Sequence, residues 1–457
     1  MTIFPKVDVN VCKSDKCKNF TLPSQPEYII PSYNLGYPAI YCASCGSNSL
    51  IVSNEDVENL LHPYFYFKNV MKCCPEYWRV DKIKYGITKT GSIRYQCKEC
   101  KKVYSTWNIR ENPVSFSKLL YMLFNNAKIS DIICYLDMSP MKFYRELEKV
   151  DTYLEMRIRS LENITFNKKH RCFETNLIKL KCRNENHTGL SNELLGLISC
   201  CGYSGYVFIS TLNWTDLRIK NISIYNHLAS TKNNHYYTNS ISSVYEKYNE
   251  FNMRPSFDQV QYSQKICSKK VIEPIAISHV HFQKLKFIHP CSSIVHYLHH
   301  DVFIRAGCMT AYGIEIWERK CDVFYVLDVD EHLSSNYFYN GSYKIGWWNN
   351  IWYEYINLEK NKSKYICNLS NSGGFIPEKY IESPFSLCFS RKFIRCFEIY
   401  FPKERIAGIS PKNIIIILSL FEKFYNFCLP IDCSSVSPAQ KNKLVFKILN
   451  IDELLNL

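Results

Sequence analysis

The spacing of apolar residues predicts a helical segment in the first third of the chain. Apolar residues recur with helical period over 119–133. The stretch 127–150 then predicts a helix, a short turn and a second helix. Ser130 is suited to cap the first of these helices, and Ser139 with Pro140 to begin the second.

In the second part of the chain the apolar runs become shorter, as is typical of strands. "CFETNLIKLKC" (172–182) predicts one strand, and two runs joined by "GYSG" within 194–214 predict a hairpin. A polar and aromatic stretch follows at 215–268, after which His279 and His281 alternate as they would on one face of a strand. Further strands and helices alternate beyond this point, which indicates a mixed α/β core.

Composition limits the class of protein. The chain has 457 residues, 46% of them hydrophobic and 21% charged, which is typical of a folded globular protein. Lysine and arginine exceed aspartate and glutamate by 14 (56 minus 42), and this excess favours a polyanionic partner. Charge alone does not separate DNA from RNA or from an anionic membrane.

The sequence indicates a cytoplasmic protein with no membrane partner. The N-terminus lacks the apolar core of a signal peptide, and the longest aliphatic run, 413–421, is too short to span a bilayer. The chain contains 22 cysteines. In a reducing cytosol, cysteine pairs are more often metal ligands or buried thiols than disulfides.

The first two cysteine pairs predict a zinc site. Cys12 and Cys17 form C-x4-C, and Cys42 and Cys45 form C-x2-C after a 24-residue spacer. Two tight turns that each present a pair can surround zinc tetrahedrally, and Gly46 suits the second turn. The alternative is a set of buried thiols, but the polar, lysine-rich surroundings favour structural zinc.

A second knuckle is formed by Cys97 and Cys100, whose upstream partners would be Cys73 and Cys74. Adjacent cysteines make an awkward pair of ligands because neighbouring side chains tend to point apart. Trp78, which stands where a partner at C-x4-C spacing would be, cannot bind metal. The sequence leaves open whether this site holds zinc or has lost it.

The two helices of 127–150 have the layout of a helix-turn-helix, whose second helix enters the major groove of DNA. On that helix, Lys142, Tyr144 and Arg145 are the candidates for base or phosphate contacts. The alternative is an ordinary helical hairpin. The position of the two helices directly after a basic, cysteine-rich region favours the helix-turn-helix interpretation, with double-stranded DNA as the partner.

The order of these parts resembles bacterial insertion-element transposases of the InsA/InsB type. The resemblance rests on the C-x4-C and C-x2-C-G pairs, on the helix-turn-helix and on "YGITKTGSIRYQCKECKKVYS" between Tyr85 and Ser105. This last stretch matches the motif YG-x-T-x-x-G-x-x-RY-x-C-x-x-C-x-x-x-(F/Y)-S. The chain is most similar to a group of long single-chain bacterial relatives of these transposases. The resemblance covers residues 10–150 well and the remainder in patches.

The resemblance implies a ribonuclease-H-like domain with an acidic triad that holds two Mg²⁺ ions for phosphodiester transfer. It assigns the triad to Glu174 in the first strand, Asp301 at the end of a later strand and Glu404 after a basic helix. Two departures weaken the match, because Glu174 replaces an aspartate and Cys201 stands where an aspartate is found near "SGY". We therefore expect strand transfer to be weakened or lost.

Together these features predict a multidomain α+β protein. Its predicted parts are a zinc-ribbon region at 1–110, a helix-turn-helix at 111–165, a diverged ribonuclease-H-like α/β domain at 166–431 with an insertion near 215–270, and a C-terminal tail at 432–457.

The predicted function is that of a DNA-binding, transposase-like protein, and a homodimer is left open. One alternative is an active Mg²⁺-dependent transposase or nuclease. Another is a non-catalytic, zinc-dependent transcriptional regulator or RNA-binding protein. The positions of Glu174, Asp301 and Glu404 discriminate between them, because convergence favours an enzyme and separation favours a binding protein.

Overall fold

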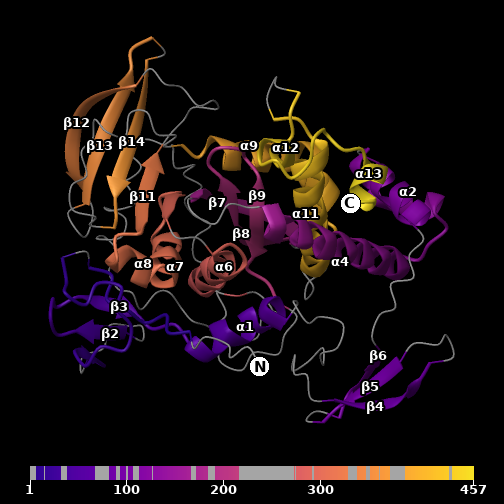
Figure 1. Ribbon diagram of the computed structural model, residues 1–457, viewed down its shortest axis with the longest axis horizontal. Coiled ribbons are helices and arrows are strands. Elements are labelled where there is room, and N and C mark those ends of the chain that lie inside the picture. The colour runs from indigo at the N-terminus through magenta and orange to yellow at the C-terminus, as the bar shows by residue number, and fades with distance from the viewer. Residues whose placement is uncertain are drawn as a thin grey trace.

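A large mixed β-sheet, covered by helices on both faces, forms the centre of the computed structural model (Figure 1). The fold is therefore mixed α+β, as predicted. None of the described helices is both long and apolar enough to cross a bilayer. The structure describes residues 7–14, 16–31, 39–66, 82–88, 93–98, 101–105, 113–125, 127–165, 171–183, 191–215, 272, 274–290, 293–327, 337–345, 350–359, 361–370, 386–431 and 435–457.

Among these residues, eight strands form the large sheet in the order β12-β13-β14-β11-β10-β7-β8-β9. In the central part of the sheet, β8 lies between β7 and β9 and is antiparallel to both. Strand β10 is parallel to both of its neighbours, β7 and β11. On the other side of β11, the strands β14, β13 and β12 extend the sheet by antiparallel pairing. The bounds are β7 Arg171–Arg183, β8 Ser191–Cys201, β9 Val207–Leu212, β10 Ile294–Leu298, β11 Cys321–Leu327, β12 Phe338–Ile345, β13 Asn350–Asn357 and β14 Lys362–Asn368.

The strand and the hairpin predicted after residue 170 are confirmed as β7, β8 and β9. Residues 171–176 of β7 are all buried, whereas in its second half the exposed Lys179 and Lys181 alternate with the buried Leu180 and Cys182. Burial of consecutive residues requires a covering layer on each face, and alternation results where only one face is covered. The first half of β7 is thus the inner part of the sheet.

Hydrogen bonds attach a helical layer to each face of the sheet. On one face, His281 of α6 bonds to Ser199 of β8 at 2.8 Å, and α7 packs beside α6. On the other face, the N–H of Ser390 at the start of α9 donates to the Glu174 carboxylate of β7 at 3.1 Å, and α11 packs on β9. The bounds of these helices are α6 Pro274–Ile288, α7 Val302–Ala311, α9 Cys388–Tyr400 and α11 Pro411–Cys428.

The prediction of a strand around His279 and His281 is wrong, because both residues belong to helix α6. Residues two apart on a helix point in different directions. His281 accordingly bonds to the sheet, and His279 is buried near Lys13 of the N-terminal segment. A helix buried on nearly all sides and a buried strand give similar short apolar runs, so the pattern alone does not separate them.

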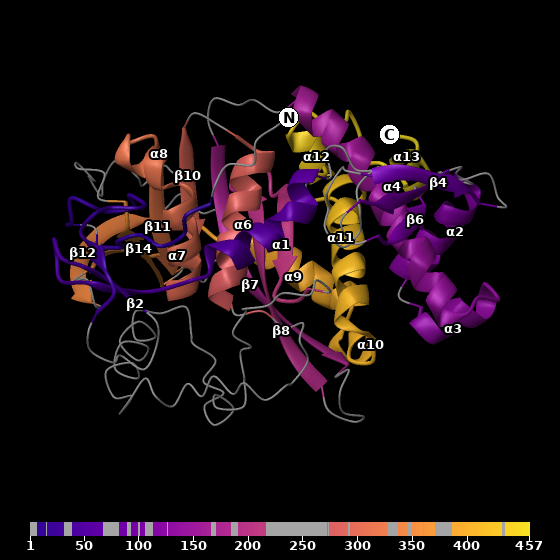
Figure 2. The same cartoon turned by 90° about the horizontal axis from the view of Figure 1, so that it is seen from below.

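The predicted helix, turn and helix are confirmed, and they lie at the opposite end of the molecule from β12 (Figure 2). Ser139 caps the second helix through a hydrogen bond from the N–H of Lys142, with Pro140 at the first position. Ser130 does not cap the first helix, whose cap position is Lys128. The helices of this lobe are α2 Pro113–Phe124, α3 Ile129–Tyr135 and α4 Pro140–Thr165.

The C-terminal segment predicted as a tail is an ordered part of this lobe. Tyr153 of α4 donates to the carbonyl of Leu455 at 2.8 Å, and Asp452 accepts a hydrogen bond from Ser117 of α2. Leu454 and Leu455 are buried in the main core. The helices of this segment are α12 Pro438–Lys441 and α13 Ile451–Leu455.

The N-terminal part contains two small antiparallel sheets and the helix α1, which packs on α6 through Val57, Leu60, Ile277 and Val280. The strands and the helix are β1 Tyr28–Ile29, β2 Ala39–Cys42, β3 Asn48–Leu50, α1 Asn54–Tyr66, β4 Lys82–Ile87, β5 Ile93–Cys97 and β6 Val103–Ser105.

Candidate functional site

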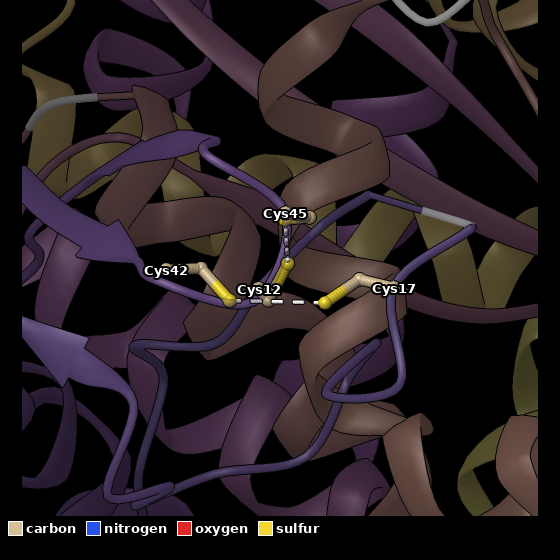
Figure 3. A group of neighbouring side chains, drawn as sticks. All are labelled: Cys12, Cys17, Cys42 and Cys45. Carbon is tan, nitrogen blue, oxygen red and sulfur yellow. Dashed lines mark hydrogen bonds between the residues drawn. The ribbon is translucent and has the colours of Figure 1, made fainter.

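The four N-terminal cysteines converge as their spacing predicts (Figure 3). The Sγ atoms of Cys12 and Cys45 are 3.6 Å apart, those of Cys17 and Cys42 are 3.7 Å apart, and all four lie within 4.8 Å of one another. A tetrahedral zinc ion with Zn–S bonds of about 2.3 Å requires sulfur atoms about 3.8 Å apart. The quartet can therefore bind a metal such as zinc.

Two tight turns place these sulfur atoms. The N–H of Cys17 donates to the carbonyl of Ser14 at 3.0 Å, and the N–H groups of Cys45 and Gly46 donate to the carbonyl of Cys42 at 3.2 and 2.8 Å. Gly46 has φ +74°, a left-handed conformation that favours glycine. The glycine that follows the C-x2-C pair is thus required by the turn.

The surroundings of the quartet favour ionised sulfur at Cys45. Burial opposes ionisation of this thiol, but hydrogen bonds with Ser47 and with the neighbouring Cys12 and Cys17 lower its pKa to about 7. The Ser47 hydroxyl lies 3.0 Å from the sulfur of Cys45. The backbone N–H of Asn19 also donates to the sulfur of Cys17, at 3.4 Å. Burial raises the pKa of the Cys12 and Cys17 thiols, so without a metal ionisation is favoured at Cys45 and opposed at these two cysteines. The thiolate is the form that binds metal, so a cation in the quartet would supply the charge that holds the other sulfur atoms ionised.

The quartet is attached to the core of the protein through α7 and α8 (Gly313–Trp317). Arg305 of α7 donates to the carbonyl of Lys13 at 2.8 Å, and Thr21 donates to the carbonyl of Gly313 at 2.9 Å. A Cβ at Gly313 would lie 2.6 Å from the carbonyl oxygen of Thr21, so only glycine allows this approach. Folding of the cysteine loops is thus coupled to their docking.

Of the second set of cysteines, Cys73, Cys74 and Cys100 lie outside the described residues. Cys97 is buried at the end of β5, and its carbonyl accepts the N–H of Lys101 in a tight turn. The second metal site therefore stays a prediction.

The residues predicted to contact DNA occupy the first two turns of α4. Lys142 and Arg145 are exposed. Tyr144 is half-buried and its ring packs edge-on against Phe143, and burial raises its pKa to about 12. Lys142 and Arg145 are thus presented to solvent, whereas Tyr144 packs partly into the core.

Glu174 is fully buried in the centre of the sheet, opposite Tyr297 of β10 and Cys200 of β8. Its carboxylate faces α9 and accepts the N–H of Ser390. A serine of α9 thus contacts the first predicted acid. Burial raises the pKa of the Cys200 thiol well above its usual value.

Asp301 belongs to the opposite layer of the sheet. It is the N-cap of α7, where its carboxylate accepts the N–H of Phe303 at 3.4 Å, and its carbonyl accepts the hydroxyl of Tyr325 at 2.9 Å. Since α7 packs beside α6 and Glu174 faces α9, the two carboxylates point to different layers.

Glu404 lies far from both. It is exposed on the short helix α10 (Lys403–Ile406), which follows α9. About 15 Å of α9 separates Ser390, beside Glu174, from Tyr400. Arg405 donates to the carbonyl of Leu123, which places α10 against the helical lobe.

Within the described part of the chain, the cysteine quartet is the one group with three or more metal-ligand atoms within 4.8 Å of each other. Glu174, Asp301 and Glu404 form no such group. The predicted triad is therefore not assembled, because its members lie in three different parts of the packing.

A set of largely buried charges, which the sequence did not predict, lies where α4 packs against α11 and α6. We call it the buried charge cluster; its members are Asp151, Glu155, Arg159, Glu162, Lys284, Glu422 and Lys423. Several of them line a cavity of about 20 Å³, which is about the room that one water molecule needs. Two signals were available: acidic residues on one face of α4, and a Glu-Lys pair within the apolar sequence of α11.

Glu162 and Glu422 are expected to make stability depend on pH. Burial raises the pKa of each carboxyl to about 7. The hydroxyl of Tyr206 donates a hydrogen bond to the Glu162 carboxylate at 2.7 Å. The charged groups near Glu162 are those of Arg159, Glu155 and Glu422. A carboxyl with a raised pKa stabilises the fold at low pH, and this contribution is lost as the pH rises from about 4.5 through 7.

Glu162→Gln is therefore expected to flatten this pH dependence. The neutral amide can still accept the hydrogen bond of Tyr206, so the variant should match the wild type near pH 5. Above pH 7 it should be more stable, on the order of 3 kcal/mol at most. Urea unfolding between pH 5 and 8 measures the difference, with the exposed Glu404→Gln as the control. Equal slopes for wild type and variant would contradict a raised pKa at Glu162.

Comparison of the chain with protein-family models, with curated proteins and with solved structures gives no match.

Proposed function

We propose that this chain is a DNA-binding protein with the architecture of a transposase, in which the predicted acidic triad does not carry out strand transfer. The observation that carries the proposal is the order of the central strands, β9-β8-β7-β10-β11, in which β8 alone runs against the others. Ribonuclease-H-like domains have this arrangement, and the predicted helix-turn-helix precedes it here.

The helical lobe supplies the proposed DNA contacts. Lys142 and Arg145 extend from the first turns of the second helix, the part of a helix-turn-helix that reads the major groove. Lys128 is exposed at the start of α3. The net charge of +14 adds a general attraction to the phosphate backbone.

The metal has a structural role in this proposal. The quartet uses four protein ligands, which leaves no open position of the kind that a catalytic zinc needs. Zinc would stiffen the two cysteine turns that dock on α7 and α8.

The separation of Glu174, Asp301 and Glu404 supports binding without catalysis. Two-metal phosphodiester transfer requires carboxylates that hold both Mg²⁺ ions about 4 Å apart. Carboxylates on two opposite layers and on a distant helix do not fit such a site, so no catalytic step is assigned to them.

Replacement of both Lys142 and Arg145 by alanine is expected to weaken duplex DNA binding roughly tenfold and to lower the salt dependence by about two charges. Fluorescence anisotropy with labelled duplex DNA over a range of salt concentrations measures both quantities. Lys320→Ala, at an exposed lysine between α8 and β11 and away from the helical lobe, is the control and should bind normally. Undiminished binding by the double variant would rule out the helix-turn-helix as the reader, and stronger binding to RNA would favour the RNA-binding alternative.

Asp301→Ala is expected to leave DNA binding unchanged and to lower the free energy of unfolding by about 1 kcal/mol, because α7 loses its N-cap. Neither wild type nor variant should nick DNA in the presence of Mg²⁺. A nicking assay on supercoiled DNA, together with urea unfolding, measures both expectations. Cleavage by the wild type that disappears in the variant would contradict the proposal and support an active Mg²⁺-dependent transposase or nuclease.

A further inference from the structure

A groove lies where the C-terminal segment packs beside α2 and meets the ends of α9 and α11 (Figure 1). Its volume is about 540 Å³, which is within the range of natural binding pockets. The floor is aromatic, because the rings of Phe124 and Phe424 stack at 4.1 Å and Tyr400 lies edge-on to Phe424 at 5.7 Å. We call it the aromatic groove; its walls come from α2, α9, α11 and the stretch from Lys447 to Glu453.

The residue directly before this stretch, Phe446, is fully exposed to solvent and does not fill the groove beside it. Its backbone is nevertheless fixed. The side chain of Gln440 donates to the carbonyl of Phe446 at 2.9 Å, and Leu444 and Leu449 on either side are buried in the main core. The surface thus carries a large aromatic ring, held out by an ordered chain, next to a pocket of suitable size and chemistry. An interface anchor and its pocket have these properties.

Charge along this surface changes from basic to acidic. Lys441 and Lys443 are exposed before Phe446, and Lys441 lies over the ring of Phe389 at the start of α9. The groove meets α9 at its last residue, about 16 Å further along the helix. Beyond the groove, the exposed Asp452 is bonded to α2. The lysines and the aspartate therefore lie at opposite ends of the surface.

We propose that this surface pairs two copies of the chain, with Phe446 of each copy inserted into the aromatic groove of the other. A two-fold pairing uses the same patch on both partners, so a patch that carries an anchor beside its pocket is complementary to itself. The same two-fold relation brings the lysine end of one copy toward the aspartate end of the other, and these ends have opposite charge. The inference goes beyond the proposed function and does not depend on DNA binding.

Sedimentation velocity of the full-length chain over a range of protein concentrations tests the pairing. The wild type should change from monomer to dimer as the concentration rises. Phe446→Ala is expected to raise the dissociation constant roughly a hundredfold, because the substitution removes two buried rings from each dimer. The melting curve of this variant should match that of the wild type, since the ring is exposed in the monomer. A wild type that stays monomeric, or a Phe446→Ala variant that dimerises normally, would overturn the proposal.

Asn125→Trp tests the groove itself. Asn125 is an exposed residue of the groove wall, so a tryptophan at this position is expected to fill the groove and block the pairing. A mixture of the two variants keeps one intact contact, between the ring of the Asn125→Trp copy and the open groove of the Phe446→Ala copy. Mixed dimers should therefore form more strongly than either variant pairs with itself. Absence of mixed dimers would show that Phe446 and the groove do not meet.

Ile314→Ala is the matched control. It removes an exposed apolar side chain from α8, at the other end of the molecule in both views, and should leave dimerisation unchanged (Figures 1 and 2). A loss equal to that of Phe446→Ala would indicate non-specific association and contradict the proposal. The Lys142 and Arg145 double variant keeps both the ring and the groove and should dimerise normally, so failure of the pairing is distinguishable from failure of DNA binding.

Discussion

Cys42→Ser is expected to lower the zinc content by about one ion per chain and to release the N-terminal segment from α7 and α8. Four thiolates hold structural zinc with a free energy on the order of 10–16 kcal/mol in small zinc domains, and the ordered loops depend on that energy. The loops contact the core through Thr21 and through the carbonyl of Lys13. Elemental analysis measures the metal, and hydrogen exchange of residues 11–23 and of α7 measures the docking.

Cys134→Ser is the control for this substitution. Cys134 is exposed on α3 and lies outside the quartet, so its loss should leave both zinc and exchange unchanged. A Cys42→Ser variant with the zinc content of the wild type would disprove metal binding by the quartet.

Lys423→Ala is expected to lower the free energy of unfolding by about 3–5 kcal/mol, the typical cost of removing one partner from a buried ion pair. The side chain of Lys423 is 4% exposed, and its Nζ lies 2.9 Å from carboxylate oxygens of both Asp151 and Glu155. Without the lysine, the two carboxylates of α4, whose side chains are 22% and 26% exposed, keep much less compensating charge in a largely buried position. Urea or thermal unfolding measures the loss.

A matched control joins the same two helices. Lys412 of α11 lies 3.6 Å from Glu148 of α4, but these side chains are 46% and 39% exposed. Lys412→Ala should therefore cost at most about 1 kcal/mol, because solvent screens an exposed pair. Similar losses from the two substitutions would show that the buried charge cluster does not hold α4 to α11.

The metal quartet was predictable because its geometry is largely local. Each cysteine pair is held by one tight turn, and Gly46 supplies the left-handed residue that the second turn requires. The start of α4 was predictable for the same reason, since Ser139 and Pro140 act within its first turn. Strand β7 was recognisable from its own run of apolar and β-branched residues.

The acidic triad could not be located in this way. Its assignment rested on the order of residues along the chain, whereas a metal site depends on where side chains point. Glu174 faces α9, and Asp301 turns toward the start of α7 on the other layer. The buried charge cluster shows the same limit, because Lys423 meets Asp151 only after two helices 272 residues apart have packed.

The sequence by itself determined the class of fold, the cysteine quartet, the two helices α3 and α4 with the turn between them, and the excess of positive charge. Tertiary structure alone decided that α6 is a helix, that the C-terminal segment is packed and that the three carboxylates lie apart. The reason is physical. Turn geometry and helix caps depend on residues a few positions apart, whereas the neighbours of a buried side chain depend on strand register and on helix packing between distant segments.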